Sequence, residues 1–248
     1  MSAAASLEGR RVLVVGASSG IGRALAIGAG AQRARVALAA RRLALVEEAA
    51  DEIRAAGGTA RAWPCDVTDE ADCGCLVAEA AAWLGGIDVV LYLSGSSPLV
   101  RVADASAALW HQMLATNVVG GALVVSAALE HLRASPDPVV VVTTHSMGAP
   151  WPWLGVYGTT KAALAELARA LRGEEPRLRV VCVAVGNTAS SFADNWDPEV
   201  ATQAFEHWME HGLLRYEVLQ SREMADAIID VVLDPTTDDD LLIAGREL

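Results

Sequence analysis

One stretch near the start of the chain constrains the fold more than any other: RVLVVGASSGIGRALA, residues 11–26. Its apolar run, Val12–Val15, has the length and composition of a buried strand, and the run ends at Gly16. Apolar residues then recur at helical spacing from Ile21 onward. The pattern predicts a strand, a tight glycine turn and a helix.

Each glycine of this turn has a role that a side chain would prevent. Gly16 allows the sharp exit from the strand, Gly20 allows a ligand to approach the backbone, and Gly22 allows close helix–strand packing. Free N–H groups and the positive helix end converge there, and together they suit a pyrophosphate. The turn therefore predicts dinucleotide binding. The alternative is a purely structural turn, since ordinary strand–helix connections also use glycine.

The next apolar segment, Arg35–Ala40, predicts a strand that ends at Arg41 and Arg42. In a dinucleotide fold this strand end lies beside the adenosine ribose, where an acidic residue would bind a free 2′-hydroxyl. Two arginines stand here instead, and guanidinium groups suit a 2′-phosphate. The pair favours NADP(H) over NAD(H). The alternative is that both arginines lie on a surface turn.

The rest of the chain alternates between predicted helices and strands, without internal repeats. The predicted helices cover residues 43–56, 71–84, 106–132, 157–171 and 221–233. The predicted strands cover residues 59–65, 87–91, 139–142, 178–184 and 241–244. At 248 residues, of which 53% are hydrophobic, the chain is long enough for a single α/β domain over residues 1–248.

Charge and apolar patterning indicate which kinds of partner and which cellular location the sequence favours. A net charge of −12 argues against nucleic acid and against an anionic membrane surface, since both require a basic face. The uncharged stretches Gln112–Leu129 and Val139–Thr160 contain polar residues, glycine or proline, and they favour buried core over membrane spans. Charges near the N-terminus and free cysteines favour a cytoplasmic protein. His207 and His211 lack a third ligand nearby, so we expect no metal.

Loops and a helix further along carry candidate cofactor contacts. Asp66 would accept a hydrogen bond from the adenine amino group, with Val67 on the ring, unless Asp66 belongs to the N-terminal region of the next helix. Ser94 and Gly95 are small enough to let the nicotinamide lie close to the backbone. Asn117 lies on an apolar helix face, and a buried amide must find partners. The pattern leaves open whether Asn117 is a satisfied core residue or holds an ordered water.

Hydroxyl groups gather at Thr143–Ser146, where ligands bind in open α/β sheets. Tyr157 and Lys161 share one helix face because they are four residues apart. The side chains of free tyrosine and lysine have pKa values of ~10 and ~10.4, but a nearby ammonium would lower the pKa of the tyrosine. Tyr157 would then exchange a proton with a carbonyl or alcohol oxygen that Thr144 or Ser146 steadies. The alternative is a half-buried tyrosine beside a solvent-facing lysine.

Taken together, these residues resemble the short-chain dehydrogenase/reductase family over nearly the whole chain. The family's glycine motif resembles Val15–Gly22, in which Ser18, Ser19 and Ile21 stand between the glycines, and its Tyr-x-x-x-Lys motif resembles Tyr157–Lys161. The resemblance implies a Rossmann-type, doubly wound parallel sheet of about seven strands, in the order 3-2-1-4-5-6-7, with helices on both faces. It also implies hydride transfer between NADP(H) and a carbonyl or secondary alcohol.

The resemblance assigns roles to the candidate catalytic residues. Tyr157 would be the acid/base, Lys161 the cation that tunes its pKa and contacts the nicotinamide ribose, and Asn117 the support of a relay water. Thr144 stands thirteen residues before the tyrosine, where the family has its catalytic serine. Ser146 is the other candidate, and either hydroxyl can donate the required hydrogen bond.

Other segments match or depart from the family pattern around the cofactor. Asp66–Val67 fall where the family contacts adenine. Tyr92–Gly95 replaces the family's Asn-Asn-Ala-Gly, so an amide that stabilises the central sheet is lost. A Val-Gly pair ending at Gly186 replaces Pro-Gly, and Thr188 or Ser190 takes the place of a threonine beside the nicotinamide.

Residues 187–216 carry aromatic side chains among polar ones, and the family places a mobile substrate lid here. Such aromatics suit an apolar small-molecule substrate, and the alternative is a helical cap packed on the core. We expect Trp110, Trp151 and Trp153 at the cleft or at an interface. The resemblance implies a homo-oligomer, a dimer or a tetramer.

Two other functions fit the same sequence. A nucleotide-binding regulator or scaffold would keep the fold without turnover, and the altered loops at 92–95 and 185–186 motivate it. The presence of both Tyr157 and Lys161 favours an enzyme instead. The third possibility is the same cofactor chemistry on an enoyl double bond.

Overall fold

Seven parallel strands form the central sheet of the computed structural model, which describes residues 6–145 and 151–247. The strand order is β3-β2-β1-β4-β5-β6-β9, which confirms the predicted arrangement. The seventh strand of the sheet carries the label β9 because β7 and β8 form a separate two-stranded pair. The strands of the sheet are β1 (Arg11–Val15), β2 (Arg35–Ala40), β3 (Thr59–Pro64), β4 (Val89–Tyr92), β5 (Val139–His145), β6 (Arg179–Val185) and β9 (Asp240–Ile243).

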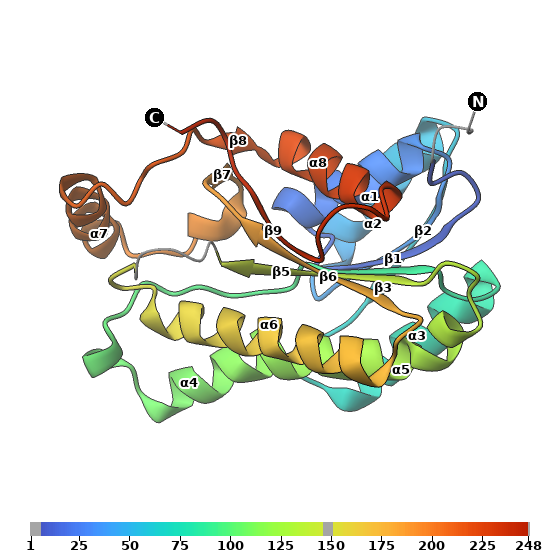
Figure 1. Cartoon of the computed structure of the whole chain (residues 1–248), viewed down its shortest axis with the longest axis horizontal. Helices are drawn as coiled ribbons and strands as arrows, with labels where there is room; N and C mark the ends of the chain where they lie inside the picture. The colour runs from blue at the N-terminus through green and yellow to red at the C-terminus, as the bar shows by residue number, and fades with distance from the viewer. Residues whose placement is uncertain (1–5, 146–150, 248) are drawn as a thin grey trace.

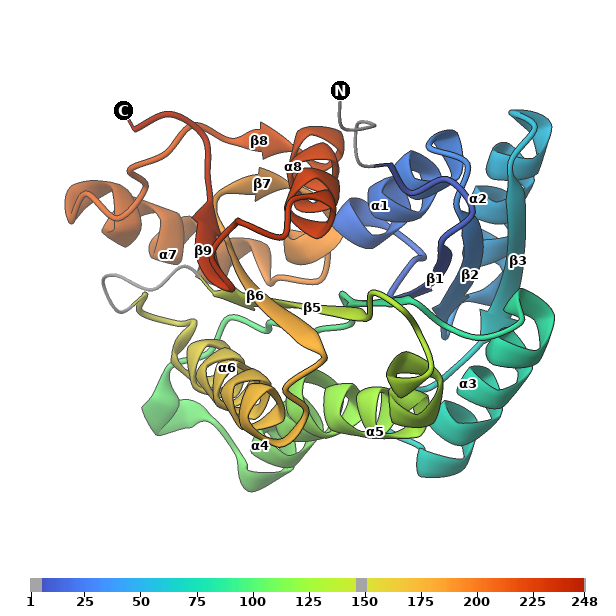
Figure 2. The same ribbon diagram turned by 45° about the vertical axis from the view of Figure 1, so that its right-hand side comes forward.

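Helices cover both faces of this sheet (Figures 1 and 2). One face carries α1 (Gly20–Ala31), α2 (Leu43–Ala55) and α8 (Ser221–Leu233). The other face carries α3 (Glu70–Leu84), α5 (Gly120–Arg133) and α6 (Gly155–Glu174). Inner strands such as β1 and β4 are apolar at nearly every position because they are buried on both sides, as expected of a parallel sheet, whereas the edge strands β3 and β9 have exposed positions.

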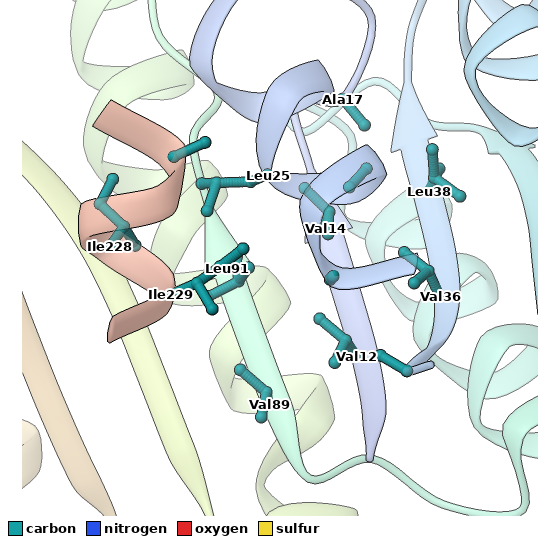
Figure 3. Close-up of a cluster of buried hydrophobic side chains, with 14 of the residues drawn as sticks. Val12, Val14, Ala17, Leu25, Val36, Leu38, Val89, Leu91, Ile228 and Ile229 are labelled. Atoms are coloured by element: carbon teal, nitrogen blue, oxygen red, sulfur yellow. The ribbon is translucent and has the colours of Figure 1, made fainter. Parts of the chain in front are cut away.

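Strand β1 shows how alternate side chains serve the two layers. Val12 and Val14 face the cluster that contains Leu25 of α1 and Ile228 of α8 (Figure 3). Leu13 lies in the opposite cluster, with α3 and α5. Full burial of one such side chain stabilises the fold by roughly 1.5–3 kcal/mol.

The predicted continuous helix over 106–132 is interrupted in the structure. It consists of α4 (Ala107–Leu114), a π-helical turn η2 (Ala115–Val119) and α5. The Tyr92 hydroxyl donates a hydrogen bond of 2.6 Å to the carbonyl oxygen of Thr116 in this turn. Gly120 makes room for the phenol, because a Cβ atom there would lie 2.7 Å from the Tyr92 oxygen.

The stretch Ala107–Arg133 is long and apolar enough to cross a membrane by length and composition. A core helix meets the same criterion, and the inner face of this stretch supplies Val124, Val125, Ala128 and Leu132 to the cluster beneath the sheet.

The predicted lid, residues 187–216, contains short elements and one longer helix. Strand β7 (Thr188–Ala189) pairs with β8 (Leu219–Gln220), and a short helix η3 (Ser191–Ala193) precedes α7 (Pro198–Glu210). Figure 1 shows α7 beyond the arrowhead of β5, at the carboxyl end of the sheet. Ala204 and Trp208 of α7 are buried in a third apolar cluster, so the segment includes a packed helical cap.

Candidate active site

A cavity of about 1080 Å³ lies at the carboxyl ends of the strands, where loops after β1 to β6 meet the segment that follows β6. Nearly all the predicted site residues line it: Gly16, Ser18, Ser19, Gly20, Ile21, Gly22, Arg41, Arg42, Asp66, Val67, Ser94, Gly95, Thr144, Tyr157, Lys161, Gly186 and Thr188. Asn117 lies behind this wall, fully buried. Ser146 lies outside the described residues.

The glycine turn has the close contacts that the sequence predicts. Gly16 has φ +94°, and a Cβ atom there would lie 2.6 Å from the main-chain nitrogen of Ser94. A Cβ atom at Gly22 would lie 2.3 Å from the carbonyl oxygen of Gly16. Ser19 is the N-cap of α1 but its side chain accepts no capping hydrogen bond. The first N–H groups of α1 therefore remain available to an anion in the cavity.

Arg42 is held over this turn by side-chain contacts. Its Nη2 atom donates to the hydroxyl oxygens of Ser18 at 2.9 Å and Ser19 at 3.0 Å. Ser191 also donates to the Ser19 hydroxyl, at 2.6 Å. Arg41 lines the same end of the cavity and is exposed. Two guanidinium groups thus lie at the end of β2, beside an open helix N-terminus.

Asp66 lies at the cavity wall, shortly before helix α3. It lines the cavity, and its Oδ1 atom accepts hydrogen bonds from the main-chain nitrogen of Thr68 at 3.0 Å and from the Thr68 hydroxyl at 2.7 Å. These bonds, and then the nearby Arg41, lower the pKa of Asp66. The N-cap of α3 is Asp69 instead. Asp66 is therefore an ionised group at the cavity wall that is already oriented by a local turn.

Asn117 is a satisfied buried amide. Its Oδ1 atom accepts from the nitrogen of Ser96 at 2.8 Å, and its Nδ2 atom donates to Ser96 O at 3.0 Å and Thr160 Oγ1 at 2.9 Å. Both amide protons are used, so the side chain joins the loop after β4 to helix α6. Gly95 lies beside both Asn117 and Lys161, since a Cβ atom there would be in ordinary contact with Oδ1 at 3.5 Å and with Nζ at 3.6 Å.

Tyr157 and Lys161 lie on the first turns of α6 and are both buried. Lys161 Nζ donates to the carbonyl oxygen of Thr143 at 2.8 Å and lies 5.7 Å from the Tyr157 ring centroid. Burial lowers the pKa of Lys161 to about 8 and raises the pKa of Tyr157. The expected lowering of the tyrosine pKa is not found here, because the ammonium is directed at Thr143 and desolvation of the phenol dominates.

Two residues at the end of β5 line the cavity that the phenol also lines. Thr144 is buried and lines the cavity, so its hydroxyl can serve a substrate oxygen. His145 also lines the cavity, with its ring edge-on to Tyr157 at a centroid distance of 5.6 Å. Burial, and then the charge of Lys161, lower the pKa of His145 to about 4, so the imidazole is neutral at physiological pH. His145 was not among the site residues expected from the sequence, although its place directly after Thr144 at a strand end was a usable signal.

Aromatic side chains close the far end of the cavity. They join helix α7 to the segment before α6 and comprise Trp151, Phe192, Trp196, Phe205 and Trp208. By contrast, Trp110 and Trp153 belong to the apolar cluster behind this wall rather than to the wall itself.

The two histidines of α7 behave as a surface pair. The rings of His207 and His211 stack at a centroid distance of 4.0 Å, and both lie near the solvent. Within the described parts of the chain, no group of three His, Cys, Asp or Glu side chains could hold a metal ion.

A family model described as short chain dehydrogenase matches residues 10–201. The chain belongs to this family. A fatty acyl-CoA reductase from Mycobacterium tuberculosis is 34% identical over 173 residues, and those residues make up 68% of this chain and 58% of that relative. A human protein, dehydrogenase/reductase SDR family member 2, mitochondrial, is 32% identical over 190 residues, or 75% of this chain and 68% of that protein.

A solved structure shares the fold over almost the whole length of this short-chain dehydrogenase. The alcohol dehydrogenase from the archaeon Thermococcus sibiricus, complexed with 5-hydroxy-NADP, superposes with a TM-score of 0.81. The match covers 95% of this chain and 96% of that one, at 22% sequence identity. Members of this family are oxidoreductases that use a nicotinamide cofactor and act on small molecules.

Proposed function

We propose that this short-chain dehydrogenase uses NADP(H) to interconvert an apolar ketone and its secondary alcohol. The observation that carries the proposal is the single cavity that joins Arg42 and the open start of α1 at one end to Tyr157 and Thr144 at the other.

The residues at the nucleotide end fit the proposed cofactor. Gly16 and Gly22 leave a cradle that a Cβ atom would fill, and the start of α1 offers N–H groups to a pyrophosphate. Arg41 and Arg42 would hold a 2′-phosphate, because guanidinium groups pair well with phosphate oxygens. NADPH bound there supplies the hydride. That the Thermococcus sibiricus relative was solved with 5-hydroxy-NADP is in keeping with this choice.

The residues at the reacting end supply the proton. Burial raises the pKa of Tyr157, so the phenol keeps its proton at neutral pH and can donate it to a carbonyl oxygen during reduction. Thr144 would donate a second hydrogen bond to the same oxygen and so stabilise its developing charge. Lys161 holds the end of β5 through Thr143 and provides positive charge beneath the phenol.

The altered loops do not favour the regulator alternative. Tyr92, which stands where the family has an asparagine, is fully buried and makes its own hydrogen bond to Thr116. The Val-Gly pair keeps Gly186 against Ala244, where a Cβ atom would lie 2.7 Å from the alanine Cβ. Both segments are therefore packed and hydrogen-bonded in place.

The test is oxidation of NADPH over a panel of apolar ketones, with NADH as the second cofactor. Tyr157→Phe keeps the ring but removes the proton donor, so we expect turnover to fall by roughly 10²- to 10⁴-fold. Binding of NADPH, followed by its fluorescence, serves as the control and should stay near the wild-type value. Binding without turnover on any ketone, and no rate loss in the variant, would support the regulator. Product analysis separates ketone reduction from reduction of an enoyl double bond.

A further inference from the structure

The substrate end of the cavity is bounded by a continuous circuit of aromatic rings. Neighbouring rings have centroids 5.1–6.1 Å apart and interplanar angles of 68–74°. The circuit runs through Tyr157, His145, Trp151, Trp208, Trp196 and Phe192, and returns to Tyr157. All six side chains line the cavity, so the circuit is a wall around the place where a substrate meets the phenol.

Two of the tryptophans are fixed by main-chain hydrogen bonds. Trp196 Nε1 donates to the carbonyl oxygen of Ser97 at 2.6 Å, and Trp208 Nε1 donates to that of Pro152 at 3.0 Å. Because both N–H groups are engaged, these indoles offer carbon surface to a substrate. Phe192 adds to the same wall a ring that has no polar atom.

The electrostatics of the same region disfavour a cation beside the phenol and an anion against the aromatic side chains. Lys161 is buried beneath it, and a second cation would be repelled there. His145 is neutral, since burial and the charge of Lys161 lower its pKa to about 4. An anion would lose its hydration against Phe192, Trp196 and Trp208 without gaining a charged partner from these three side chains.

We propose that the substrate is a neutral aryl ketone, and that Trp196 and Phe192 determine this specificity by contacting its ring. This inference rests on the proposed function. Aromatic pairs prefer edge-to-face geometry, and one such pair favours an aryl ring over a saturated ring of the same size by about two- to tenfold. In the reduction, the carbonyl carbon would gain the hydride of NADPH, its oxygen would gain the Tyr157 proton, and solvent would return a proton to the phenolate, which leaves NADP⁺ and a secondary alcohol as products.

The test compares acetophenone with cyclohexyl methyl ketone, which differ in the ring alone. The kcat/KM ratio of the two is measured in the wild type and in Trp196→Leu, so that their intrinsic reactivities cancel between proteins. We expect the acetophenone-to-cyclohexyl ratio to fall by about two- to tenfold in Trp196→Leu and in Phe192→Leu. Trp196→Phe keeps a ring and should retain most of the preference.

A matched control and a binding measurement complete the experiment. Trp83→Leu makes the same substitution on α3, where the indole packs on Trp63 outside the cavity, and should leave the ratio unchanged. Tryptophan fluorescence gives the dissociation constants of 1-phenylethanol and 1-cyclohexylethanol, and we expect their difference to shrink in Trp196→Leu.

The outcomes separate the two proposals. If no ketone is reduced with either cofactor, the proposed function is wrong. If both ketones are reduced and the ratio is the same in the wild type, Trp196→Leu and Phe192→Leu, the aryl specificity is wrong and the reductase stands. If the ratio falls in both leucine variants and is kept in Trp196→Phe and Trp83→Leu, the aryl specificity is supported.

Discussion

At the glycine turn of the nucleotide half the cavity wall is formed by main chain, whereas at the substrate half it is formed by aromatic side chains. Gly16 and Gly22 bring peptide groups so close together that a Cβ atom would overlap a neighbouring backbone atom. In the other half, Trp151 and Trp208 come from segments far apart in the sequence and meet through their rings, and Phe192 meets the Tyr157 ring in the same way. A main-chain wall accepts few substitutions, while a side-chain wall can change one residue at a time, so cofactor binding can persist while the substrate range varies.

We expect the largest effect from Gly22→Ala, which tests whether the glycine turn of the nucleotide half tolerates a side chain. The new Cβ atom would lie 2.3 Å from the carbonyl oxygen of Gly16. We expect the free energy of unfolding to fall by about 3 kcal/mol and nucleotide binding to be lost. Urea unfolding and a cofactor titration measure both quantities.

The matched control for that change is Gly74→Ala on the exposed face of α3. A Cβ atom there meets nothing within 4 Å, so alanine should stabilise the helix by about 0.5–1 kcal/mol. If Gly22→Ala bound the cofactor with wild-type affinity, the claim that the main-chain wall accepts few substitutions would be wrong.

Arg42→Leu tests one of the two arginines on which the nucleotide half would depend for cofactor choice. Loss of a charge-assisted contact should weaken NADPH binding by roughly 10- to 100-fold, with little change for NADH. Arg177→Leu, an exposed arginine away from the cavity, is the control. If the affinities for NADPH and NADH fell equally, Arg42 would hold the turn through Ser18 and Ser19 and would not contact the 2′-phosphate.

The pH profile tests Lys161, where the two halves meet. Burial lowers its pKa to about 8, so the side chain is cationic below that pH and neutral above it. Because the proposed chemistry uses the cation, kcat/KM for ketone reduction should be level below about pH 8 and fall by up to about tenfold per pH unit above it. A level profile to pH 10, in protein that stays folded by circular dichroism, would contradict this role.

Tyr92→Phe should give the smallest effect, because it removes one hydrogen bond behind the wall. The Thr116 carbonyl would lose its 2.6 Å partner, and the free energy of unfolding should fall by about 1 kcal/mol, or roughly 2–4 °C in Tm. Since Asn117 follows Thr116 in the same π-helical turn, a few-fold loss of turnover should accompany it. Tyr216→Phe, at a partly exposed tyrosine, is the stability control. An unchanged Tm in Tyr92→Phe would show that the turn holds without this bond.

The sequence predicted the main-chain half well because its features are local. An apolar strand followed by glycines and a helix fixes the turn at Gly16–Gly22, and parallel strands bring their carboxyl ends to one edge. For the same reason Arg42, Asp66 and Tyr157 could be expected in one cavity before their positions were known.

The side-chain half was predicted less completely because it depends on tertiary contacts. The ring pair of Trp151 and Trp208, at 5.1 Å, leaves no periodic signal in the sequence. The π-helical turn was missed because one extra residue barely changes an apolar helical pattern; the two glycines after it were the available hint. The pKa of Tyr157 was misjudged because it depends on burial and on where Lys161 donates its hydrogen bond.

The most direct test of the central claim is transfer of deuterium from nicotinamide-labelled NADPH to a ketone in a single turnover. With the wild-type protein, we expect the label on the carbinol carbon of the alcohol. With Tyr157→Phe, we expect transfer to be at least about 100-fold slower, although NADPH still binds. The proposed hydride transfer would be contradicted if the wild type bound NADPH tightly without any transfer, or if Tyr157→Phe transferred deuterium at the wild-type rate.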